Sequence, residues 1–182
     1  MYIPIIKTGE AEIRALSKLT PAMLKDMMPI IELTRGRRKT RSEGVNKIIS
    51  YSFENRLSKV KEYLKGQTIF LDLTADESLL SNEVYQLYNP QDGYANWRHF
   101  INSSIGENGF ASAIPAILFN WDDDDFESNF RMQVELLGNE CGELMYRSSI
   151  QTKDCYDDLP LILKYLPQDC GLWIVLDGGY LQ

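Results

Sequence analysis

The chain has 182 residues, of which 44% are hydrophobic and 25% are charged, as in ordinary soluble globular proteins. This length suffices for one domain with a substantial core, and no apolar run reaches the roughly 18 residues that a membrane-spanning helix needs. The formal net charge of −7 disfavours general binding to nucleic acids or membrane surfaces. Because the N-terminus lacks the pattern of a signal peptide, we expect a cytoplasmic protein with no membrane partner.

The cysteines and the histidine argue against a zinc centre. The three cysteines lie far apart without a Cys-x-x-Cys pair, and His99 is the only histidine. We therefore expect reduced structural thiols, and a structural or surface role for His99.

Short apolar segments alternate with segments of helical spacing along the chain. The predicted strands are 2–7, 28–33, 68–73, 113–120, 144–147 and 172–177. The predicted helices are 10–19, 21–26, 45–64, 78–88, 97–105, 126–142 and 154–166. The strands lack in/out alternation, which indicates burial on both faces and a parallel sheet with right-handed crossovers.

Six strand–helix units predict an α/β fold and leave two architectures open. We favour a partial or shortened (β/α)-barrel of six strands, since a complete barrel has eight strands and about 250 residues. The alternative is a doubly wound open sheet. In either case residues 1–182 form a single α/β domain, and a barrel would make that domain incomplete at its C-terminus.

The first 75 residues resemble a known family. The segments that carry the resemblance are Tyr2-Ile-Pro-Ile-Ile-Lys7, Gly9-Glu10, Ala15-Leu16, Met28-Pro-Ile-Ile-Glu32 and Leu71-Asp72. Together they are similar to the opening of the phage T4 beta protein family, the beta family proteins. The resemblance implies a TIM-barrel-like fold, a longer protein, and a phage or bacterial setting near defence-associated genes, with no assigned reaction.

Each predicted strand carries a polar or charged residue at its carboxyl end or one residue before it. These residues are Lys7, Glu32, Asp72, Asn120, Arg147 and Asp177. Both candidate folds place ligands at the carboxyl ends of their strands. The carboxylates of Glu32, Asp72 and Asp177 are candidate ligands for Mg²⁺ or Mn²⁺, and the cations of Lys7 and Arg147 could neutralise a phosphate ester. The alternative is internal pairing, for instance of Lys7 with Glu32.

A basic segment follows the second predicted strand. Residues 35–41 carry five positive charges, at Arg35, Arg37, Arg38, Lys39 and Arg41. Since the net charge of the whole chain is −7, the remaining residues carry a net charge of −12. A polar loop of this kind could contact phosphate or nucleic acid, since guanidinium groups bind phosphate in a bidentate manner. We favour the other reading, a solvated loop that balances an acidic surface.

The acidic run from Asp122 to Asp125 has two readings as well. Carboxylates before a helix complement its macrodipole, and this is the reading that we favour over a cation site.

Two hypotheses of function follow. The first is a non-catalytic protein-binding module, with a protein partner or a second copy, in phage or bacterial antiviral defence or counter-defence. The second is a metal-dependent enzyme with catalytic residues Lys7, Glu32, Asp72, Arg147 and Asp177, acting on a phosphorylated or nucleotide-like substrate.

Overall fold

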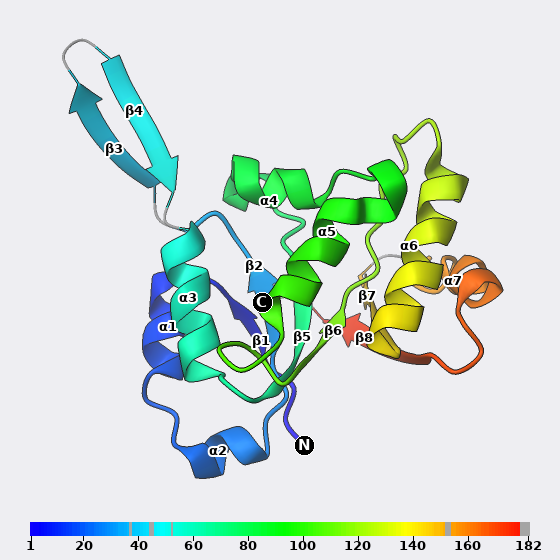
Figure 1. The fold of residues 1–182 in the computed structure, drawn as a ribbon, viewed down its shortest axis with the longest axis horizontal. Helices are drawn as coiled ribbons and strands as arrows, with labels where there is room; N and C mark the ends of the chain where they lie inside the picture. Colours follow the sequence, from blue (N-terminus) through cyan, green and yellow to red (C-terminus); the bar gives the residue numbers. More distant parts are fainter. Residues whose placement is uncertain (37, 44–45, 52, 152–153, 179–182) are drawn as a thin grey trace. The chain divides into compact units, whose positions relative to one another are not determined.

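A computed structural model describes residues 1–36, 38–43, 46–51, 53–151 and 154–178, with only the backbone for 38–43 and 46–51 (Figure 1). The chain divides into two compact units. Unit 1 comprises Met1–Leu87 and Ile101–Ala113, and unit 2 comprises Tyr88–Phe100 and Ile114–Gln182. The expectation of a single domain stays a prediction.

Four strands form the larger sheet in the order β1–β2–β5–β6 (Figure 1). They are β1 (Ile5–Lys7), β2 (Ile30–Leu33), β5 (Thr68–Leu73) and β6 (Ser112–Pro115). The pairs β1–β2 and β2–β5 are parallel. All of β2 and all of β5 after Thr68 are buried, as their continuous apolar sequences require. The predicted α/β class with a parallel sheet is confirmed.

Two helices of unit 1 begin at Glu10 and Pro21, as the sequence predicts, and two others begin later than predicted. They are α1 (Glu10–Leu16), α2 (Pro21–Lys25), α3 (Phe53–Tyr63) and α4 (Asn82–Leu87), with a 3₁₀ turn η1 (Glu77–Leu79) before α4. Thr20 caps α2, since its Oγ1 accepts a hydrogen bond from the Met23 N–H at 3.4 Å. Helices α1 and α3 lie side by side (Figure 1).

The prediction for residues 35–64 was wrong in its first half. Instead of a loop and one long helix, the chain forms an antiparallel hairpin of β3 (Arg38–Glu43) and β4 (Asn46–Tyr51) before α3. Ile48, Ile49 and Tyr51 are residues that strands favour, although the two isoleucines also fit the helical spacing. The helical stripe begins only at Phe53, which is buried together with Leu57 and Val60.

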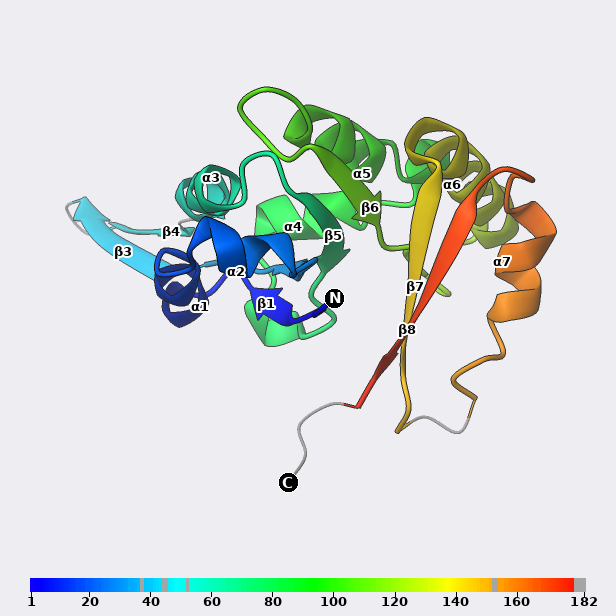
Figure 2. The same cartoon turned by 90° about the horizontal axis from the view of Figure 1, so that it is seen from below.

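Unit 2 contains a second parallel strand pair with helices beside it (Figure 2). Its elements are α6 (Phe126–Cys141), β7 (Glu143–Ser149), α7 (Leu159–Tyr165) and β8 (Gly171–Asp177). Gly142 ends α6 in the left-handed conformation, with φ of 73°, and a glycine adopts this conformation without strain.

Two buried side chains satisfy backbone groups in unit 2. Trp97 Nε1 donates to the Ala116 carbonyl at 3.1 Å. Gln133 binds both backbone groups of Leu118: its Oε1 accepts from the N–H at 2.7 Å, and its Nε2 donates to the carbonyl at 2.9 Å. These side chains hold the segment after β6 in addition to its isolated parallel bridge with β7, where the Ile117 N–H donates to the Met145 carbonyl at 2.8 Å.

Helix α5 (Gln91–Ser104) opens with a left-handed turn. Asp92, Gly93 and Tyr94 have φ values of 52°, 65° and 56°. A Cβ atom at Gly93 would lie 2.7 Å from Met132 Cβ, so the lack of space favours glycine there in addition to the positive φ.

The described strands form the sheet of four, the parallel pair and the hairpin, and they do not close into a barrel. A TIM-barrel-like architecture therefore stays a prediction. Within the described ranges, no helix has both the length and the apolar character needed to cross a membrane.

Candidate functional site at the strand ends

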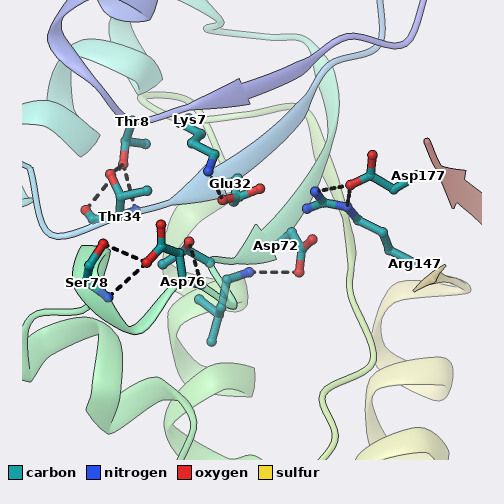
Figure 3. A network of polar contacts seen from close by, with 11 residues as sticks. Lys7, Thr8, Glu32, Thr34, Asp72, Asp76, Ser78, Arg147 and Asp177 are labelled. Atoms are coloured by element: carbon teal, nitrogen blue, oxygen red, sulfur yellow. Dashed lines mark hydrogen bonds and ion pairs between the residues drawn. The ribbon is translucent and has the colours of Figure 1, made fainter. Parts of the chain in front are cut away.

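Three of the predicted site residues occupy one row of the larger sheet. Lys7 of β1 pairs in register with Glu32 of β2, and Glu32 pairs in register with Asp72 of β5. Since in-register neighbours of parallel strands project from the same face, the three side chains share one face near the carboxyl ends of their strands (Figure 3).

Lys7 and Glu32 form an ion pair. Lys7 Nζ lies 3.3 Å from Glu32 Oε1, and the two side chains are 30% and 5% exposed. A carboxylate that is this deeply buried is costly unless a cation and hydrogen bonds compensate it. The ammonium group of Lys7 therefore neutralises Glu32, and the internal pairing considered for these two residues is present.

Asp72 is held differently. The residue is 7% exposed, and its Oδ1 accepts a hydrogen bond from the backbone N–H of Leu73 at 2.8 Å. A backbone N–H that donates to a carboxylate forms a charge-assisted bond, which stabilises the ionised form.

Buried threonines complete this edge, and the sequence reasoning missed them. Thr8 Oγ1 accepts from the Thr34 N–H at 2.8 Å and lies 3.0 Å from Thr34 Oγ1. Thr74 is also buried. A sequence signal was available, since Glu32-Leu-Thr34 and Asp72-Leu-Thr74 repeat one acid–Leu–Thr pattern.

Asp76 adds a carboxylate to the same edge. Its Oδ1 accepts from the Ser78 hydroxyl at 2.6 Å and from the Ser78 N–H at 2.9 Å, which caps η1. The hydroxyl of Ser78 is the largest cause that holds the pKa of Asp76 below its usual value, and the charges of Lys7 and Arg35 contribute in the same direction. Asp76 therefore lies within electrostatic reach of both cations.

The predicted basic segment is distributed over several elements. The Arg35 N–H donates to the Leu79 carbonyl at 2.7 Å, which places this residue beside η1. Arg38, Lys39 and Arg41 lie in β3, and Arg37 lies outside the described residues.

The remaining predicted residues belong to unit 2. Arg147 Nη2 and Nε donate to Asp177 Oδ2 at 2.6 and 3.2 Å, and the side chains are 19% and 25% exposed (Figure 3). Asn120 accepts from the Asp122 N–H at 3.2 Å, which closes a turn instead of ending a strand. The predicted strand 113–120 is therefore too long, because β6 ends at Pro115.

No group of three or more His, Cys, Asp or Glu residues within the described ranges is arranged to hold a metal ion. In the acidic run, Asp123 Oδ2 accepts from Asn129 Nδ2 at 2.9 Å, and α6 begins immediately after Asp125. A Mg²⁺ or Mn²⁺ ion bound by Glu32, Asp72 and Asp177 stays a prediction.

Comparisons with known proteins agree with the resemblance seen in the sequence. A segment of 99 residues is 28% identical to Protein beta of Enterobacteria phage P4, covering 54% of this chain and 25% of that protein. The chain thus spans about a quarter of the length of this curated relative, which comes from phage P4 and not from T4. No solved structure matches. The model of the Beta protein family matches residues 2–149, and the chain therefore belongs to the Beta protein family.

Proposed function

We propose that the chain is a non-catalytic protein-binding module whose contact surface is β8, through the face that carries Ile174 and Leu176 and through its outer edge. The observation that carries this proposal is the exposure of an apolar strand: Ile174 and Leu176 are 48% and 46% exposed. Parallel strands are normally covered on both faces, so apolar side chains at this level of exposure indicate a surface that a partner covers.

The edge itself has the features of a strand-addition site. β8 pairs with β7 on one side, and none of the other described strands pairs with it. Its sequence, Gly171-Leu-Trp-Ile-Val-Leu-Asp177, contains none of the lysines or prolines that natural edge strands use to prevent pairing. The carboxylate of Asp177 is bound to Arg147. The occupant that fits is an extended strand of another polypeptide, held by backbone hydrogen bonds and apolar contacts.

The internal bonds of the strand-end carboxylates support the non-catalytic half of the proposal. Glu32 is neutralised by Lys7, Asp177 by Arg147, and Asp72 accepts from a backbone N–H. Carboxylates that compensate cations of the same chain have less capacity to bind a metal ion or to accept a proton from a substrate.

The phage P4 relative supports a phage-related setting, and we propose that this setting is antiviral defence or counter-defence. Plating efficiency on cells that express the chain would test this setting. We expect the wild type to alter plating of some phages, and the Ile174→Lys variant to lose that effect. Equal plating with both proteins would contradict the proposed link between β8 and the phage setting.

Photo-crosslinking in cells tests the contact surface. A benzophenone amino acid replaces Leu176 at the β8 edge, and the control replaces Tyr85, which is 68% exposed in unit 1. We expect a discrete protein adduct from position 176 and not from position 85, and we expect Ile174→Lys to reduce it. An adduct yield at 176 no higher than at 85, together with a strictly monomeric mass by light scattering, would refute the proposal.

The metal-dependent enzyme retains one favourable observation, the row of Lys7, Glu32 and Asp72 at the carboxyl ends of adjacent strands. Calorimetric titration with Mg²⁺ or Mn²⁺ distinguishes it from the binding module, because only the enzyme needs the ion.

A further inference from the structure

A second candidate binding surface lies in unit 1 and is independent of β8. It is the basic ribbon, which we define as β3 and β4, residues 38–43 and 46–51. Six register pairs join the two strands, from Arg38 opposite Tyr51 to Glu43 opposite Asn46. The structure thus places the basic segment on a regular antiparallel scaffold, where the sequence alone suggested a loop.

The charge of the basic ribbon contrasts with the rest of the protein. The ribbon carries four cations and one carboxylate, a net charge of +3, at Arg38, Lys39, Arg41, Lys47 and Glu43. Because the whole chain carries −7, the remaining residues carry −10. Cations so concentrated on an acidic protein repel one another, and an anionic ligand would relieve that repulsion.

The register does not provide that relief within the ribbon. Arg38, Lys39 and Arg41 stand opposite Tyr51, Ser50 and Ile48, so no carboxylate lies directly across from any of the three. Opposite charges on facing residues would be the usual means of stabilising such a pair of strands. Charge pairing between facing residues of the two strands therefore does not explain why the cations are concentrated in the ribbon.

The shape of the ribbon selects the class of anion. At about 3.4 Å per residue, a six-residue strand extends over roughly 17 Å, which matches about five phosphate spacings along one DNA strand. A two-stranded ribbon fits the major groove of B-form DNA, whereas the major groove of A-form RNA is too narrow for it. We propose that the basic ribbon binds double-stranded DNA through contacts with its phosphates.

The affinity of the basic ribbon for DNA should depend steeply on the salt concentration. Each phosphate contact contributes about −0.9 to the slope of log affinity against log salt concentration, so that four cations give a slope of up to about −4. Neutralising Arg38, Lys39 and Arg41 should bring the slope close to −1. Binding through phosphates also predicts weak dependence on DNA sequence.

Fluorescence anisotropy with a labelled DNA duplex of mixed sequence tests the proposal on the full chain. The test variant is Arg38→Gln/Lys39→Gln/Arg41→Gln. The matched control is Lys18→Gln/Lys25→Gln/Lys59→Gln, which removes three exposed cations of unit 1 outside the ribbon. Both variants have a net charge of −10, so any difference between them reports position and not total charge. We expect at least about tenfold weaker binding at low salt and a shallower slope for the test variant only.

A charge-retaining variant separates the role of charge from the integrity of the hairpin. Arg38→Lys/Arg41→Lys should bind the duplex within about threefold of wild type, because the lysine ammonium groups keep the positive charge that attracts phosphate. Equal affinity of the test and control variants would overturn the proposal, and so would an unchanged salt slope. Tighter binding to duplex RNA or to a single strand than to duplex DNA would overturn the assignment to the DNA groove.

Discussion

The ion pair of Lys7 with Glu32 provides the most informative stability experiment, a double-mutant cycle with Lys7→Met and Glu32→Gln. At 3.3 Å and an effective dielectric constant of 20, the attraction is about 5 kcal/mol before the cost of desolvation is subtracted. Removing one partner of a fully buried pair costs about 3–5 kcal/mol. Since Lys7 is 30% exposed, water screens part of the attraction between the two charges. We therefore expect Lys7→Met to lower the free energy of unfolding by about 2 kcal/mol.

Urea unfolding of the four proteins measures the coupling free energy, for which we expect about 1–2 kcal/mol. The control cycle is the exposed pair of Arg14 and Glu10, joined at 3.5 Å with side chains 74% and 59% exposed. Its coupling should stay below about 0.5 kcal/mol. A Lys7–Glu32 coupling no larger than the control would refute the assignment of this pair as a structural element.

Three further predictions concern single sites. Gln133→Met leaves the N–H and the carbonyl of Leu118 without their side-chain partner, and should lower the free energy of unfolding by about 2–4 kcal/mol in urea. The carboxyl pKa of Asp76, measured by NMR, should lie below the usual value and should rise in Ser78→Ala. Because the pKa is lower in the folded than in the unfolded state, the ionised carboxylate stabilises the fold at pH values above the unfolded-state pKa. This stabilisation disappears as the pH falls through the folded-state pKa. Burial, with smaller contributions from neighbouring groups, raises the pKa of the Cys141 thiol to about 11, so alkylation at pH 8 should be slow in the folded protein and fast in urea.

The sequence predicted best where local pattern and tertiary environment agree. Residues 68–73 were assigned as a strand with the bounds that the structure shows, because a continuous apolar run of this length fits a strand buried on both faces. Pro21 and Pro160 occupy first-turn positions of α2 and α7, as expected for proline.

Prediction from the sequence failed where the spacing typical of a helix and the residue types typical of a strand occur in the same residues. Ile48 and Ile49 fit a helical stripe that continues to Phe53, and only their pairing with Arg41 and Thr40 across the hairpin makes β4 a strand. Such pairing depends on register, which hydrophobic spacing does not reveal.

The candidate site was predictable in its members but not in their bonds. The strand ends correctly placed Lys7, Glu32 and Asp72 on one edge. Whether a carboxylate there pairs internally depends on side-chain geometry, and the internal pairing of Lys7 with Glu32 was only one of two open readings. The Thr8–Thr34 contact was not predicted, because threonine hydroxyls carry no charge and this contact joins residues that lie 26 positions apart in the sequence.

Calorimetric titration of Mn²⁺ into the purified chain tests most directly the claim that these carboxylates serve structure and not catalysis. We expect only heats of dilution, equal in wild type and in Asp72→Asn, while the photo-crosslinking of β8 remains positive. Saturable binding of Mn²⁺ that is lost in Asp72→Asn and in Glu32→Gln would contradict the account and favour the metal-dependent enzyme.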